Sequence, residues 1–598
     1  MVNRLVADGC NLAKYQLKDD KPMLRQAELP DISRSRLDII LSSSALNLLA
    51  LALPVMILQV YDRIIPNNAT DTLTLLVTGV GIALLFEAFF RLARSYITAF
   101  NGAKFEHIAG CRAMYRTLGA KISRYEEEAT GVHLHRFNAI DSLREFMSGS
   151  NILVFIDLPF AVIFIAMVGY IGGSLVWAPI ILLAFFGLVT FLVGSGLRKA
   201  LTDKSVWEDR RYNFLIEVLT GIHTVKGLSL EAQMIRRYER LQETTAGTMR
   251  DVAFKNSVAQ NLGAIFSQVT LLSVAAIGSV LVIDGQLSIG GLAACTLLSG
   301  RALQPLMRAM GVWTHYQNIK IARDRVTTLL NLPQSPNPAE DDELTATALG
   351  LGNPNGIDLT FEDVNFKLSE DGPPIFEHVN AHFPAGTTSA LVGANSTGKT
   401  TLLWLALGMH RPTSGRILLG GKDLSEIPRA VVHELVAYLP TNGNIFHGTI
   451  LENLTTFRKG RYIDEAMALS EELGLDEVIK RLPFGYDTVV GDGAADGLPG
   501  GIRQRISIAR ALVSKPKLIL FDEANTSLDA HGDEILKKAM QNQQGKATIL
   551  LVSHRPSLLK ISNQGFRIEN SQLTPASVED LTSFGTPQKK QTPNIKVV

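Results

Sequence analysis

The residues best suited to chemistry lie in the segment GANSTGKT, where a glycine-rich loop leads into an apolar run. It fits GxxxxGK[ST] and stands between the apolar run SALVG and the helical pattern KTTLLWLALG, the strand–loop–helix setting that a phosphate-binding loop requires. Glycines let backbone N–H groups surround phosphates, and the helix dipole favours their charge. A chance glycine-rich turn is the alternative. The loop predicts ATP binding through Gly393, Ala394, Asn395, Ser396, Thr397, Gly398, Lys399, Thr400 and Thr401.

Two adjacent acids, Asp522 and Glu523, end the apolar run LILF. The first carboxylate can hold Mg²⁺ through water, and the second can orient and activate an attacking water. We therefore predict that Thr400 and Asp522 bind Mg²⁺ and that Glu523 and Lys399 are catalytic. His554 follows the run ATILLV, at a strand end where ligands of parallel sheets gather. We predict that His554 is a third catalytic residue that senses the γ-phosphate; a structural histidine is the alternative.

The elements that must position these residues lie between 357 and 570. Apolar strands alternate there with helical segments, which is typical of an α/β unit with a largely parallel sheet. A linker rich in Pro, Asn, Gly and acids precedes it over 326–356, and a polar tail follows over 571–598. The prediction is an α/β P-loop NTPase domain.

The segment 37–325 has the composition of a membrane domain. The chain is 46% hydrophobic and only 19% charged, and its apolar excess precedes Pro305. A bilayer crossing needs about 20 mostly apolar residues. Arg301 interrupts the last candidate span and either faces a polar path or snorkels to the interface. The prediction is an all-α membrane domain of six helices, with spans at 39–61, 73–90, 152–170, 175–197, 262–283 and 289–303.

The connections between these spans indicate their orientation. The short connections contain a single basic residue, Arg63, whereas the two long connections are rich in Lys and Arg, which tend to stay in the cytoplasm. The long connections show helical periodicity, so we expect helices that extend the spans into the cytoplasm. Short crosswise helices are predicted near 131–147 and 221–231. The polar segment 1–36 lacks the apolar core of a secretory signal, so we expect that it is not cleaved off. The charges of the connections place it in the cytosol.

The net charge excludes one class of partner. With 58 basic and 57 acidic residues, the formal charge is +1. No strong field draws such a chain to nucleic acid, so we expect no nucleic-acid partner.

The order of these motifs resembles the ATP-binding cassette family over almost the whole chain: a phosphate loop, LPGGIRQRISIARAL, LILFDEANTSLD and VSHR. The resemblance implies an exporter half that works as a dimer, with ATP between the phosphate loop of one half and the LSGGQ signature of the other. Lys399, Thr400, Asp522, Glu523 and His554 match the family's catalytic positions. Asp529, in SLDA, matches the loop that couples the two sites.

Other positions depart from the family pattern. The signature consists of Leu498, Pro499, Gly500, Gly501 and Ile502, so a proline replaces the serine and an isoleucine the glutamine. Proline offers neither a hydroxyl nor an N–H. Leu368 replaces the aromatic that stacks on adenine, and Thr441 the glutamine after YLP. We expect weaker stacking and weaker coordination of water or Mg²⁺.

The segments LPVMILQVYDRIIPNNATDTL and DLPF are similar to type I secretion exporters, inner-membrane ATPases that work with a periplasmic adaptor and an outer-membrane channel. The resemblance implies protein or peptide export, an inner (cytoplasmic) membrane location with contact to membrane lipid, and those partners. Pro499 favours a heterodimer whose second half supplies an intact signature, and a homodimer is the alternative. A weakly active regulatory half, or an exporter of lipid or small molecules, also remains open.

Overall fold

The computed structural model describes Leu29 and residues 36–148, 150–334, 350–351, 353, 355–369, 372–458, 460–491, 498–577 and 581. These residues divide after Pro333 into a helical unit and an α/β unit. The predictions for most of the N-terminal segment, for 335–349 of the linker and for the end of the tail lie outside the described residues.

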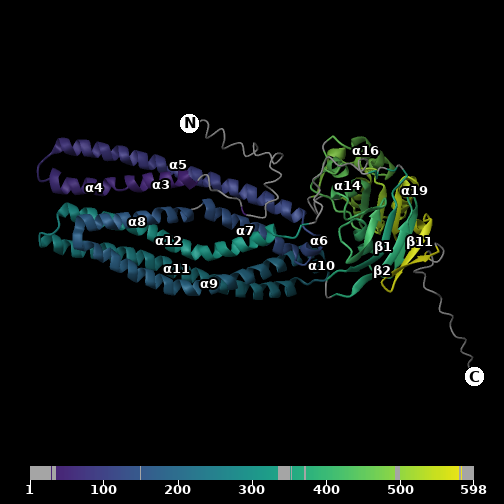
Figure 1. The fold of residues 1–598 in the computed structure, drawn as a ribbon, viewed down its shortest axis with the longest axis horizontal. Coiled ribbons are helices and arrows are strands. Elements are labelled where there is room, and N and C mark those ends of the chain that lie inside the picture. The colour runs from purple at the N-terminus through teal and green to yellow at the C-terminus, as the bar shows by residue number, and fades with distance from the viewer. Residues whose placement is uncertain are drawn as a thin grey trace, which may run out of the picture. The chain divides into compact units, whose positions relative to one another are not determined.

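Long helices build the first unit (Figure 1). The longest have 49 and 53 residues, or about 74 and 80 Å at 1.5 Å per residue. A hydrocarbon layer is only about 30 Å thick, so the prediction that helices continue beyond the spans is confirmed. The helices are α3 (Arg36–Leu49), α4 (Ala52–Gln59), the π-turn η3 (Val60–Ile64), α5 (Thr70–Leu118), α6 (Ile122–Tyr125), α7 (Thr130–Ser148), α8 (Ser150–Gly172), α9 (Trp177–Thr220), α10 (Ile222–Gly227), α11 (Glu231–Ile283) and α12 (Ile289–Leu330).

Four stretches of the described helices are long and apolar enough to cross a membrane: Asp38–Ile64, Thr70–Leu118, Ile156–Val189 and Glu231–Ile283. The third overlaps two of the predicted spans, 152–170 and 175–197, and the 3₁₀ turn η4 (Gly173–Val176) separates α8 from α9 within it. The predicted span at 289–303 is helical, as the first part of α12. It is not among the four, since Arg301 and Gln304 lower its hydropathy.

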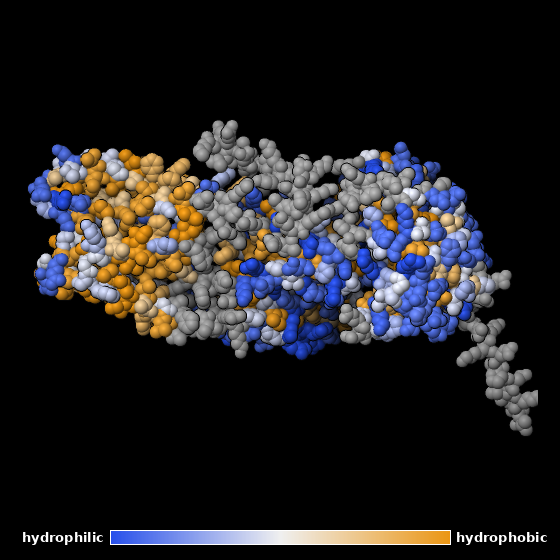
Figure 2. Space-filling model, viewed as in Figure 1, coloured by the Kyte–Doolittle hydropathy of each residue, from blue (hydrophilic) through white to orange (hydrophobic). Residues whose placement is uncertain are grey.

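Apolar side chains cover the surface of the helical unit where the candidate spans lie. In Figure 2 they gather at the left, over the parts of the helices that contain the spans. Leu75, Leu85 and Ile283 are each more than two-thirds exposed. A surface so apolar is costly in water and favourable in lipid, as expected for a membrane domain.

One prediction about the long connections is wrong. The segment 131–147 is part of the long helix α7, which buries Ala139, Ile140 and Leu143 against α5 and α12. This apolar face makes a continuous helix that packs along the bundle favourable. The short helix of this connection comes earlier, as α6. Near 221–231 a short helix does occur, as α10.

The second unit combines two sheets. Within the described residues, a six-stranded sheet has the order β12-β11-β3-β10-β9-β6, parallel except for the pair β11 and β12. A four-stranded antiparallel sheet, β2-β1-β4-β5, was not expected. The strands are β1 (Leu359–Lys367), β2 (Pro374–Phe383), β3 (Thr388–Gly393), β4 (Ser414–Leu419), β5 (Lys422–Asp423), β6 (Val436–Leu439), β9 (Leu518–Asp522), β10 (Thr548–Val552), β11 (Gln564–Glu569) and β12 (Gln572–Ala576), with the pair β7 (Gly448–Thr449) and β8 (Val489–Val490) apart.

Both faces of the parallel strands are buried. Because side chains alternate between the two faces, one strand contributes to two apolar cores. In β9, Leu518 and Leu520 join one apolar core, with residues of α13 (Lys399–Ala406). Ile519 and Phe521 join a second core, with residues of α18 (Gly500–Leu512) and α19 (Ala530–Gln543). The middle of the sheet is therefore rigid, and its strand ends are fixed in place.

The α/β unit continues past the limit predicted at residue 570. Residues 572–576 form β12, which pairs with β11 through Leu573 opposite Ile568. Leu573 is buried while its neighbours are exposed. One buried side chain in a polar strand leaves little trace in the sequence, which explains the difference.

Candidate nucleotide site

The candidate site lies at one edge of the parallel sheet. The strands β3, β10 and β9 are neighbours and run in the same direction. Their carboxyl ends therefore meet at a single edge, where ligands of such sheets bind. Gly393 ends β3, Asp522 ends β9, and His554 follows β10 by two residues. The fold thus brings together the residues that the sequence placed in three separate motifs.

The phosphate loop has the backbone that its glycines predict. Gly398 has φ +98°, and a Cβ there would lie 2.9 Å from the Phe376 ring, so only glycine fits. Lys399 begins α13, followed by Thr400 and Thr401. The Lys399 ammonium donates to the carbonyls of Gly393 and Ala394, each at 3.0 Å. Lysine therefore lies across the mouth of the loop, where it can transfer its hydrogen bonds to phosphate oxygens.

Asp522 lies at the centre of a polar network behind the loop. Its Oδ1 accepts from the Thr400 hydroxyl at 3.2 Å, and its Oδ2 accepts from the Tyr438 hydroxyl at 2.8 Å. The Trp404 indole N–H donates in turn to the Tyr438 oxygen at 3.3 Å. Sequence reasoning missed Tyr438 and Trp404; the tyrosine at the end of the strand VAYL was the available signal.

Burial changes the acid–base properties of this network. Desolvation raises the pKa of Asp522, although its bonds with Tyr438 and Thr400 act in the opposite direction. Burial also raises the pKa of Tyr438, and the neighbouring Asp522 charge adds to the rise. The tyrosine therefore remains a hydrogen-bond donor at neutral pH.

Glu523 and His554 form a pair next to Asp522. The Glu523 carboxylate lies 3.1 Å from Nε2 of His554, and both side chains are partly exposed. Glu523 has φ +49°, a conformation that costs energy for a residue with a side chain. This turn directly follows the carboxyl end of β9, so Glu523 lies at the same edge of the sheet where β3 leads into the phosphate loop.

The signature segment lies at the start of α18. Pro499 is the N-cap residue, and no side chain caps the helix. Gly500 and Gly501 form the first turn, while Leu498 and Ile502 are buried in the second apolar core. Their positions fit a structural role for both apolar residues. The helix still presents backbone N–H groups, but proline adds no donor to them.

The remaining departures are visible in the structure. Leu368 is 62% exposed just beyond β1 and has no aromatic ring to offer a base. The Thr441 hydroxyl donates to the backbone carbonyl of Asp522 at 2.9 Å. Asp529 caps α19 by accepting from the N–H of Gly532 at 2.7 Å. Its carboxylate therefore has a structural task within this chain.

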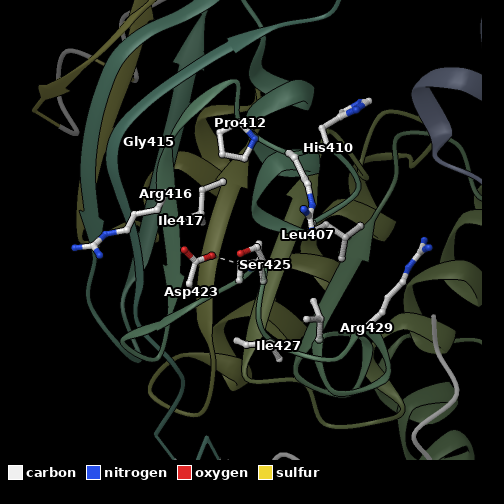
Figure 3. A pocket seen from close by; sticks show the side chains of 14 residues that line it. Leu407, His410, Pro412, Gly415, Arg416, Ile417, Asp423, Ser425, Ile427 and Arg429 are labelled. Carbon is white, nitrogen blue, oxygen red and sulfur yellow. Dashed lines mark hydrogen bonds between the residues drawn. The ribbon is translucent and has the colours of Figure 1, made fainter. Parts of the chain in front are cut away.

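A separate pocket of about 220 Å³ is lined by the end of α13 and by residues near β4, β5 and α14 (Arg429–Leu435). Figure 3 shows Leu407, Ile417 and Ile427 on its walls, while the guanidinium groups of Arg416 and Arg429 lie far apart on opposite sides. None of the phosphate-loop or catalytic candidates lines it. Because Arg416 and Arg429 do not converge and no residue of the phosphate loop lines the pocket, it does not fit a triphosphate.

The fold and the site define a class: a membrane-embedded helical unit joined in one chain to a P-loop nucleotide-binding unit. Comparison with known families agrees. Residues 38–306 match the ABC transporter transmembrane region, and residues 376–526 match the ABC transporter family. The chain belongs to the ATP-binding cassette transporters, as a multi-pass membrane subunit of the exporter type that binds and hydrolyses ATP.

Similar proteins are known from secretion systems. The chain is 28% identical to the alpha-hemolysin translocation ATP-binding protein of Escherichia coli O157:H7, over 91% of this chain and 76% of the relative. It is 28% identical to the toxin RTX-I translocation ATP-binding protein of Actinobacillus pleuropneumoniae, over 90% and 74%. A solved bacterial Atm1-family ABC exporter with ATP bound has a TM-score of 0.77 at 22% identity, covering 92% of this chain and 96% of that one. The last comparison bears on the fold alone.

Proposed function

We propose that this chain is one half of a dimeric exporter that moves a protein or peptide across the inner membrane in a type I secretion-like system. The relatives named above are translocation proteins for toxins, which supports a polypeptide cargo. A periplasmic adaptor and an outer-membrane channel would complete the path. The proposal divides the chain into an exporter domain over 37–325 and a cassette domain that begins at 357 and extends through β12 to residue 576.

The proposal rests on one observation: the predicted catalytic residues meet at the carboxyl ends of β3, β10 and β9. Lys399 and the loop N–H groups bind the triphosphate, and Glu523 orients and deprotonates the attacking water. His554 lies 3.1 Å from Glu523. It holds the carboxylate in place and contacts the γ-phosphate.

The residues beside the loop also fit a magnesium ion. Thr400 and Asp522 offer a hydroxyl and a carboxylate within 3.2 Å of each other, and Mg²⁺ prefers such oxygen ligands. When bound, the ion would neutralise charge on the β- and γ-phosphates. Tyr438 fixes the Asp522 carboxylate so that an oxygen remains directed toward Thr400.

The departures in the signature point to a heterodimer. In a homodimer both nucleotide sites would face Pro499, which offers no hydrogen bond to the γ-phosphate. In a heterodimer, the Lys399–Glu523 site would face the sound signature of the other half. One productive site per dimer then drives transport.

The test is ATP hydrolysis by the purified chain, alone and with a candidate second half. We expect hydrolysis to require the second half and to be lost with Glu523→Gln. Brisk hydrolysis by the chain alone, abolished by the same substitution, would remove the case for a heterodimer. Binding of ATP without hydrolysis in either preparation would instead favour a regulatory half, the second candidate, which Pro499 and Leu368 support.

A further inference from the structure

A cluster of charged side chains lies where four helices of the membrane unit meet. The Asp157 side chain, on α8, is 3% exposed. Its Oδ1 accepts from Asn47 of α3 at 2.9 Å and lies 3.6 Å from Arg94 of α5. Its Oδ2 accepts from Arg308 of α12 at 3.2 Å. Arg94 also donates to the Ser43 hydroxyl at 3.2 Å.

The charges in this cluster do not balance. Two guanidinium groups share one carboxylate, while Asn47 and Ser43 are neutral. An excess positive charge among apolar helices is expensive unless an anion or water compensates it. The imbalance therefore points to a counter-charge from outside the cluster.

The same helix carries a second arginine on the same side. Arg301, Gln304 and Arg308 follow one another at spacings of three and four residues, which places them on one face of α12. On the adjoining side of the helix, Leu298, Ala302 and Pro305 are buried. The Arg308 side chain is 40% exposed although Asp157 anchors it. An arginine that faces lipid is costly, so this face of α12 is suited to an aqueous path.

We propose that Arg94, Arg301 and Arg308, here called the basic patch, recognise acidic side chains of the polypeptide in transit. The inference rests on the proposed function and adds a substrate class, cargo with acidic segments. Arg301 and Arg308 are about 10.5 Å apart along α12 at 1.5 Å per residue. About three residues of extended chain span that distance. Asp157 is a positioning residue that holds Arg308 toward the path.

Charge and depth favour a peptide over an anionic lipid. The predicted span 289–303 places Arg301 inside a hydrocarbon layer of about 30 Å, about 18 Å along α12 from Ile289 at 1.5 Å per residue. With that placement, a lipid headgroup at the membrane surface would reach Arg308 but not Arg301. An extended acidic chain along α12 reaches both.

The test measures binding of a fluorescent peptide with a glutamate at every third position to the full chain in nanodiscs of neutral lipid. Anisotropy reports the dissociation constant without ATP, so the result does not depend on hydrolysis. We expect Arg301→Gln with Arg308→Gln to raise that constant at least about tenfold, since charge-assisted hydrogen bonds are lost. Arg301→Lys with Arg308→Lys should restore most of the affinity.

Two controls separate the alternatives. Arg91→Gln removes a charge that is 68% exposed on α5 and pairs with Glu87, and it should leave the peptide affinity unchanged. A glutamine version of the peptide should bind at least about tenfold more weakly than the glutamate peptide. Equal affinities for the two peptides, or for the chain with and without the double substitution, would overturn the proposal. Competition by anionic lipid that depends on Arg308 alone would assign the site to lipid instead.

The assay also distinguishes this inference from the proposed function. Acidic-peptide binding that depends on the basic patch, in a chain that hydrolyses no ATP with any partner, would support the patch and refute the exporter cycle. Normal ATP hydrolysis with Glu523 intact, together with no binding of the acidic peptide, would support the exporter cycle and refute the role of the basic patch.

Discussion

Two regions of the α/β unit differ in what they offer a nucleotide. At the edge of β3, β10 and β9, Lys399, Asp522, Glu523 and His554 come together with partners at 2.8–3.2 Å. At the start of α18, Pro499 is the N-cap residue and makes no side-chain capping hydrogen bond. The first region brings the predicted catalytic groups together, and the second offers no side-chain hydroxyl at position 499. In the dimer proposed above, each nucleotide site combines the first region of one half with the second region of the other. This chain would then supply the catalytic groups of one site and the proline signature of the other.

The largest expected effect comes from the intact region. Glu523→Gln should lower the rate of ATP hydrolysis about 100- to 1,000-fold in the preparation that is active, because the amide cannot accept the water's proton. ATP binding should persist, since Lys399 and the loop are unchanged. Phosphate-release assays and nucleotide binding together check this. A rate within threefold of the unsubstituted protein would show that another group acts as the base.

Removal of the loop lysine tests nucleotide binding in the same region. Lys399→Ala should weaken ATP binding about 10- to 100-fold, because charge-assisted hydrogen bonds to phosphate contribute about 1.5–3 kcal/mol. Equilibrium binding of a fluorescent ATP analogue measures it. Unchanged affinity would mean that the triphosphate binds elsewhere, and the comparison of the two regions would lose its basis.

Adding a hydroxyl at position 499 tests the second region, the start of α18. Pro499→Ser should raise hydrolysis by the chain alone about tenfold, since serine can both cap α18 and donate to a γ-phosphate. The matched control is Pro499→Ala, which removes proline without adding a hydroxyl. If the alanine variant gains as much as the serine variant, the limitation is backbone geometry and not the missing donor.

A smaller gain in ATP affinity is expected from a change at the position where adenine would stack. Leu368→Tyr should tighten ATP binding about two- to tenfold, because an aromatic contact contributes about 0.5–1.5 kcal/mol. The same measurement with a triphosphate that lacks a base provides the control, and its affinity should not change. An equal gain for both ligands would exclude stacking on adenine.

The smallest effect concerns pH. Burial raises the pKa of Asp522, and the Tyr438 hydrogen bond counteracts the rise by stabilising the carboxylate. Tyr438→Phe should therefore raise this pKa further, so the loss of Mg²⁺-dependent hydrolysis on acidification should begin at a higher pH. A pH–rate profile of both proteins checks the direction. A shift to lower pH would contradict the assigned role of Tyr438.

Local pattern was enough to predict much of this protein. The motif GxxxxGK[ST], the acid pair after LILF and the long apolar segments can each be recognised from one continuous stretch of sequence. Each meets a local physical requirement: tight turns around phosphate, charge at a strand end, or enough length to cross lipid. The helical continuation of the long connections followed from periodicity in the same way. The antiparallel sheet did not, because its half-exposed strands owe their structure to distant partners such as Leu359 with Leu419. β12 did not either, because it buries a single side chain, that of Leu573.

The sequence by itself determined the chemistry that this chain can carry: a phosphate loop, two acids, a histidine and a signature without its hydroxyl. Only the tertiary structure decided which groups meet. It joined Tyr438 to Asp522, and it brought Arg94 and Arg308 to opposite oxygens of Asp157, across 151 residues in the case of Arg308. Burial and charge balance depend on neighbours that are far apart along the chain, so no local pattern contains them.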